Sequence, residues 1–158
     1  MARDQRIAEI VLDQDSAIRL SPELAHEREV AIYDLIEDNS FRPLGKFKGP
    51  YKLVLSLEDN RLRFDLRSRR DKPVVNFTLP MTSFRRIVRD YFTVCESYFE
   101  AIKTATPSKI EAIDMGRRGL HNEGSEMLRE RLAKYVEIDQ DTARRLFTLL
   151  CALHIRRM

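Results

Sequence analysis

Three consecutive segments of this sequence alternate between apolar and polar residues, and this alternation constrains the fold more than any other feature. Residues 51–57, 62–66 and 75–79 each carry apolar side chains at every second position. Side chains of a β-strand point alternately to opposite faces of a sheet, so each segment has one apolar and one polar face. Asp59 and Asn60 fit a tight turn between the first two segments. The pattern predicts an antiparallel meander with helices on one face and water on the other.

Apolar residues at three- and four-residue spacing predict several helices. The longest such stripe runs through residues 83–104 and indicates the main core helix. Ser21 and Pro22 are typical of a helix start, and they open an amphipathic segment that extends to about Asp38. The glycines between residues 115 and 125 predict a break in the chain's helical structure. Further helices are expected over 107–115, over 125–133, and from Asp139 or Asp141 toward the C-terminus.

The order of these elements predicts an α+β fold. Residues 6–12 and 135–138 indicate two more strands, whereas residues 41–50, with two prolines and two glycines, indicate a loop. The sheet is expected to be mostly antiparallel, an N-terminal strand plus a three-strand meander, with helices packed on one face and a helical C-terminal half. No alternating parallel units are expected. The length of 158 residues suits a single domain, residues 1–158.

Composition excludes several classes of protein. Apolar residues make up 43% and charged residues 34%, which is typical of a globular protein with a heavily ionised surface. The two cysteines, Cys95 and Cys151, both lie on apolar helical patterns, which favours buried, reduced thiols over a disulfide framework or a zinc site. No signal peptide or membrane helix is expected, so we predict a cytoplasmic protein that does not contact a membrane. No cofactor or metal is expected either.

The segment between Ile110 and Glu126 concentrates the side chains that can carry chemistry. Arginine pairs and helix N-termini both bind phosphate or carboxylate groups, which makes this segment a candidate site for a phosphorylated small molecule. An imidazole and a carboxylate there could act as acid and base. The alternative is structural, with the glycines ending one helix, the arginines paired to nearby carboxylates, and an asparagine capping the next turn. The candidate residues are Asp114, Arg117, Arg118, His121, Asn122 and Glu123.

A second candidate surface lies on the polar face of the predicted meander. Residues 61–89 carry nine basic residues against Asp65 and Asp71, although the net charge of the whole chain is only +3. Arg61, Arg63 and Arg67 share one side of a strand and could neutralise several phosphates of RNA or another polyanion. The alternative is that these arginines only protect a wet sheet face from aggregation.

Protein association is a third possibility. The acidic segment at residues 21–38 could meet the basic hairpin of a second copy, which would produce a homodimeric scaffold. Taken together, the residues favour a non-enzymatic binding or regulatory protein that binds RNA or another polyanion, because no nucleophile, base pair or cofactor loop stands assembled. The enzyme alternative would act on a phosphorylated small molecule through His121, Glu123 and Asp114, with Arg117 and Arg118 as the anion site.

Several long motifs resemble those of one protein family. The run IEAIDMGRRGLHNEGSE, the upstream run SFRRIVRDYFTVCESYFEAI and the downstream run DTARRLFTLLCAL are similar to a family of small alphaproteobacterial proteins of the uncharacterised (UPF or DUF) class. The segments HEREVAIYDLIEDNSF and GPYKLVLSL extend the resemblance over nearly the whole chain. The resemblance implies a family identity but no activity and no catalytic residues, so any function must follow from the chemistry of the residues themselves.

Overall fold

The main sheet holds four strands. The computed structural model describes residues 4–13 and 22–154. The strands lie in the order β1-β3-β4-β5, and all neighbours except β1 and β3 are antiparallel. Asp59 and Asn60 form the turn between β3 and β4 with positive φ angles of 48° and 62°, as expected for a tight hairpin. The strand bounds are β1 Ile7–Asp13, β3 Tyr51–Glu58, β4 Arg61–Arg67 and β5 Pro73–Pro80.

Strand β1 has a direction that the sequence did not predict, because it runs parallel to β3. The two strands are connected through helix α1 (Pro22–Glu37), so this part of the chain is a parallel crossover unit. The main sheet is nevertheless mostly antiparallel, as predicted, because the other two strand pairs are antiparallel. Alternation identifies the buried face of a strand, but it contains no information about the direction of the neighbouring strand.

A second, two-stranded sheet corrects the prediction of a loop over residues 41–50. Strand β2 (Phe41–Pro43) pairs antiparallel with β6 (Val136–Ile138), so the first three residues of the predicted loop at 41–50 are a strand. Arg42 and Glu137 lie opposite each other in this ladder and form an ion pair. Phe41 is fully buried. A strand of three residues is too short to show periodicity, so only its partner near residues 135–138 could be predicted.

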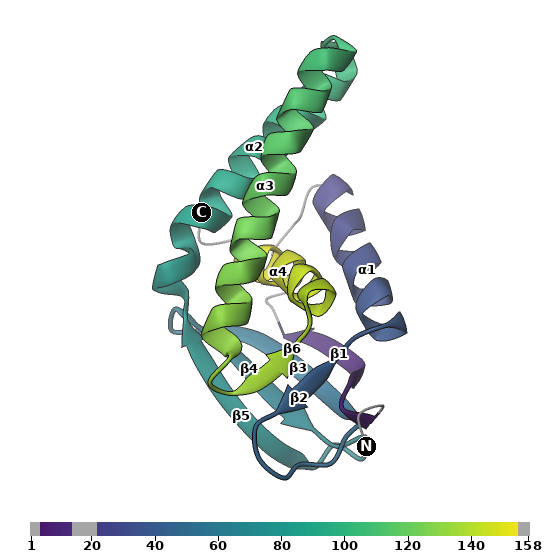
Figure 1. Ribbon diagram of the computed structural model, residues 1–158, viewed down its shortest axis with the longest axis vertical. Helices are drawn as coiled ribbons and strands as arrows, with labels where there is room; N and C mark the ends of the chain where they lie inside the picture. The colour runs from purple at the N-terminus through teal and green to yellow at the C-terminus, as the bar shows by residue number, and fades with distance from the viewer. Residues whose placement is uncertain (1–3, 14–21, 155–158) are drawn as a thin grey trace.

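The helices pack on one face of the main sheet, which confirms the predicted α+β class (Figure 1). Helices α2 and α3 form an antiparallel hairpin that extends away from the sheet, while α4 lies between α3 and α1. A short 3-10 turn, η2 (Met81–Phe84), leads into α2. Ile102, near the far end of the hairpin, is 51% exposed because that end projects beyond the core. The remaining helix bounds are α2 Arg85–Thr104, α3 Pro107–Leu132 and α4 Gln140–His154.

Helix α3 overturns the predicted break in the glycine-containing segment. It runs without interruption through Gly116, Gly119 and Gly124. Thr106 caps its start by accepting a hydrogen bond from the Lys109 amide. Gly124 is buried against α4. The two helices are so close there that a Cβ atom at this position would overlap with the ring of Phe147. Packing against α4 therefore outweighs the low helix propensity of glycine.

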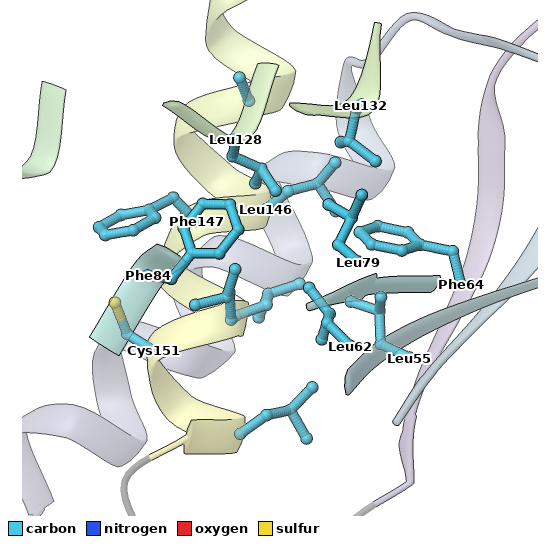
Figure 2. Close-up of a cluster of buried hydrophobic side chains, with 14 of the residues drawn as sticks. Leu55, Leu62, Phe64, Leu79, Phe84, Leu128, Leu132, Leu146, Phe147 and Cys151 are labelled. Atoms are coloured by element: carbon cyan, nitrogen blue, oxygen red, sulfur yellow. The ribbon is translucent and has the colours of Figure 1, made fainter. Parts of the chain in front are cut away.

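The core fills the space between the inner sheet face and the helices (Figure 2). In Figure 2, Leu55, Leu62, Phe64 and Leu79 of the sheet lie on one side of the cluster, and Phe147 and Cys151 of α4 lie on the other. Leu128 of α3 belongs to the same cluster. The predicted burial of both cysteines is confirmed, and burial raises the pKa of the Cys95 thiol to about 11.

Candidate functional site

A cavity of about 640 Å³ opens between α1 and α3. Helix α4 lies between these two helices and forms its floor, and α2 contributes one residue. Such a volume is typical of sites for small molecules. The cavity is lined by His26, Glu27, Val30, Ala31 and Asp34 from α1, Tyr91 from α2, Arg117, Arg118 and His121 from α3, and Asp141, Arg144, Arg145 and Thr148 from α4.

Helical periodicity explains why these side chains meet. The α4 residues are spaced at three and four positions from Asp141 to Thr148, so they form one polar face opposite the apolar face that packs in the core. Arg117 and His121 are one turn apart on the same face of α3, because the helix continues through the glycines. The continuous helix thus brings together three of the predicted site residues, Arg117, Arg118 and His121.

His121 forms the inner part of the cavity. Its Nε2 atom lies 2.8 Å from the Thr148 hydroxyl, and its Nδ1 atom lies 3.4 Å from the Ser125 hydroxyl. The ring also packs edge-on against Tyr91 and Phe147, with centroid distances of 5.3 and 5.2 Å. Burial, followed by the charges of Arg144 and Arg117, lowers the His121 pKa to about 4. The imidazole is therefore neutral at neutral pH.

Arg117 is fixed by three helices. Its Nη2 atom donates to Asp114 Oδ1 at 2.6 Å, and its guanidinium lies 4.8 Å from the Tyr98 ring centroid. Its Nη1 atom lies 3.9 Å from Glu27 Oε1 on α1. The other oxygen of Asp114 binds Arg118, with an Nε–Oδ2 distance of 3.0 Å. Both arginines therefore pair with Asp114. This is the pairing with a nearby carboxylate that the structural alternative predicted.

Glu27 is the carboxylate that faces Arg117 from the opposite wall. Burial raises its pKa, while the charges of Arg117 and His26 lower it, and burial dominates. The distance of 3.9 Å to Arg117 is too long for a strong hydrogen bond. Arg117 therefore has donor capacity beyond its contact with Asp114.

Arg144 and Arg145 were missed at the sequence level. Arg145 Nη1 donates to the Asp38 carbonyl oxygen at 2.7 Å, which ties α4 to the end of α1. Arg144 is exposed and forms no ion pair within residues 4–13 and 22–154. The apolar positions of the final helix predict only its buried face, although the polar residues of DTARR, at the same helical spacing, indicate a second face.

Three predicted residues do not line the cavity. Asn122 and Glu123 are exposed on other faces of α3, because each position rotates by about 100° around the helix axis. Asp114 lies one turn before Arg118 and acts on the cavity only through the two arginines. His121 and Glu123 therefore do not face the cavity together.

The arginines of the outer sheet face alternate with buried residues of β4, so they point away from the sheet face on which the helices pack. Arg67 donates to Asp71 at 2.8 Å and to Asp65 at 3.2 Å. Arg61 donates to the Thr78 hydroxyl at 3.1 Å. Much of the donor capacity of these two arginines is thus used within the chain.

Strand β1 changes the charge of the same outer face. Glu9 lies beside Lys52 and Asp13 beside Ser56, so β1 adds two acidic residues to the face that carries Arg63. Arg63 itself sits between Ser56 and Thr78 in the ladders. The outer face is therefore less basic than its central strand alone.

Two further features of the described residues bear on the site. No three or more His, Cys, Asp or Glu side chains in this part of the chain are grouped in a way that could hold a metal ion. None of the helices within the described ranges has both the length and the apolar character that crossing a membrane requires.

Comparison with known proteins identifies the family. A family model described as "Uncharacterised protein family (UPF0262)" matches residues 4–156. A UPF0262 protein of Paramagnetospirillum magneticum is 58% identical over 99% of both chains. Those of Rhodospirillum rubrum and Agrobacterium fabrum are 59% and 55% identical, over 95% and 97% of this chain and 92% and 97% of theirs. No solved structure matches. As the sequence motifs predicted, the chain belongs to the uncharacterised protein family UPF0262.

Proposed function

We propose that the cavity between α1, α3 and α4 binds a small molecule through a phosphate or carboxylate group, so that the protein acts as a binding or sensor protein. One observation carries the proposal: Arg117 and Arg144, from two different helices, line the same cavity as the partly buried His121. Burial lowers the His121 pKa most, and the charges of Arg144 and Arg117 lower it further. Cations that converge on a half-buried site repel one another. A bound anion would relieve this repulsion and accept hydrogen bonds from both guanidinium groups.

The contacts of His121 support binding rather than acid–base chemistry. Both ring nitrogens already have hydroxyl neighbours, Thr148 and Ser125. The Ser125 hydroxyl donates to the His121 carbonyl oxygen at 2.7 Å, so its oxygen is left to accept from Nδ1. We therefore assign His121 as a neutral wall of the site that positions the ligand between the arginines.

RNA binding through Arg61, Arg63 and Arg67 stays a prediction, as does a homodimer. The internal hydrogen bonds of Arg61 and Arg67 leave this face with less free donor capacity than the cavity. The test is purification from the native cell at low salt. RNA that binds this face should be lost at moderate salt and in an Arg63→Glu, Arg67→Glu variant.

The cavity is tested by calorimetric titration with inorganic pyrophosphate at low ionic strength. Arg144→Gln should weaken binding about tenfold or more, because one charge-assisted hydrogen bond contributes about 1.5–3 kcal/mol. Arg131→Gln is the matched control, since Arg131 is exposed on α3 and outside the lining. No heat of binding for the wild type, or equal affinity in the wild type and Arg144→Gln, would overturn the proposal.

A further inference from the structure

Side chains of both charges line the cavity, and the groups around His121 are mainly cationic. The end formed by Arg117 and His121 lies beside Thr148, in the third turn of α4, through the contact of 2.8 Å to His121. The start of α1 also faces this end, because Glu27 approaches Arg117. Arg144, one turn before Thr148, adds its positive charge here and acts directly on His121. This is the anion end of the cavity.

The opposite end carries two carboxylates. Arg145 donates to the Asp38 carbonyl, which places the first turns of α4 beside the last turn of α1. The Ser40 amide also donates to the Thr142 hydroxyl at 3.0 Å, at the same junction. Asp34 lies one turn before Asp38, and Asp141 lies one turn before Arg145, and both line the cavity.

Neither carboxylate has a cationic partner in the described part of the chain. Asp34 and Asp141 form no ion pair within residues 4–13 and 22–154, although Arg145 lines the same cavity. The Arg145 guanidinium donates instead to a backbone carbonyl. Carboxylates that face a cavity without a partner attract a cationic group and repel an anionic one.

The two ends are separated by one to two helical turns, because Arg144 lies three residues beyond Asp141 on α4, about 5 Å along the helix axis. Glu27 and Asp34 on α1, like Thr148 and Asp141 on α4, are seven residues apart, which corresponds to about 10 Å. We infer that the ligand is a small dipolar molecule, with a phosphate or carboxylate between Arg117 and Arg144 and an ammonium or guanidinium group near Asp34 and Asp141. This inference rests on the proposed function, because it assigns the second end of the same cavity.

Two matched probes test the inference. Hexyl phosphate presents the anion alone, while aminohexyl phosphate adds a terminal amine on a flexible chain that is long enough to reach from one end to the other. Each is titrated into the wild-type protein and into an Asp34→Asn, Asp141→Asn variant. Glu29→Gln is the control, because it removes a carboxylate from the solvent face of α1.

The amine should tighten binding to the wild type about fivefold, as expected for one partly exposed ion pair. The gain should persist in the Glu29→Gln control. It should disappear in the double variant, which should bind hexyl phosphate as well as, or better than, the wild type. Equal affinity of the two probes for the wild type, or a gain that survives in the double variant, would overturn the dipolar ligand while the anion site stands. If neither probe binds the wild type, the proposed function itself falls.

Discussion

Alanine substitution at the three glycines of α3 should have opposite effects on stability, and this contrast tests the continuous helix directly. Gly116 and Gly119 lie in the helix, and an added Cβ would meet nothing within 4 Å at either position. Each substitution should therefore raise the free energy of unfolding by about 1 kcal/mol, the difference in helix propensity between glycine and alanine.

Gly124 is the opposite case. A Cβ there would overlap with Cζ and Cε1 of Phe147 and lie 2.7 Å from Cε2. The ring is fully buried and packs against His121, so it has no free space into which it could move. Overpacking of this kind costs about 1–3 kcal/mol, and the propensity gain offsets only part of it. We expect Gly124→Ala to lower the free energy of unfolding by about 1–2 kcal/mol net.

Urea denaturation followed by circular dichroism measures all three variants on one scale. The midpoint should rise for Gly116→Ala and Gly119→Ala and fall for Gly124→Ala, with unchanged slopes. If alanine destabilises the protein equally at the three positions, the segment is not the open-faced helix described above, and the spacing of Arg117 and His121 along α3 loses its basis.

Three further predictions concern buried or partly buried side chains. The unfolded chain binds a proton at His121 more readily than the folded protein, so stability should fall by about 2 kcal/mol between pH 7 and pH 5, and His121→Asn should reduce this fall in urea titrations at both pH values. Asn39→Ala should lower the free energy of unfolding by about 2–3 kcal/mol, because the Asn39 side chain bonds both the amide and the carbonyl of buried Ile7, at 2.7 and 2.8 Å; urea denaturation measures this loss. Cys95 and Cys151 should not react with a thiol reagent at pH 8 until denaturant is added, because both are buried with raised pKa values.

Periodic segments were predictable because their signal is local. The alternation of β3, β4 and β5 and the apolar stripe of α2 follow from which side chains must be buried, and burial depends on position within a single element. The tight turn at Asp59 and Asn60 was predictable for a similar reason, since both residue types tolerate positive φ angles.

Features that depend on distant packing were not predictable. The helical state of the glycine segment depends on Phe147, more than twenty positions away in the sequence, and the direction of β1 depends on its partner β3.

Only part of the candidate site could be predicted from the sequence. Arg117, Arg118 and His121 were predicted because they lie close together in one segment rich in polar residues. Arg144 and Arg145 were not predicted, because only the fold brings α4 next to that segment.

The most direct test of the account is the titration of the His121 imidazole by NMR, with and without saturating inorganic pyrophosphate. Without the anion, the His121 pKa should be about 4. Burial lowers this value most, and the charges of Arg144 and Arg117 lower it further. A pyrophosphate bound between the two arginines offsets their charges, so the pKa should rise and the ring resonances should shift during the titration. A His121 pKa and ring spectrum that do not change with pyrophosphate, or shifts confined to the residues of the outer sheet face, would contradict an anion site in this cavity.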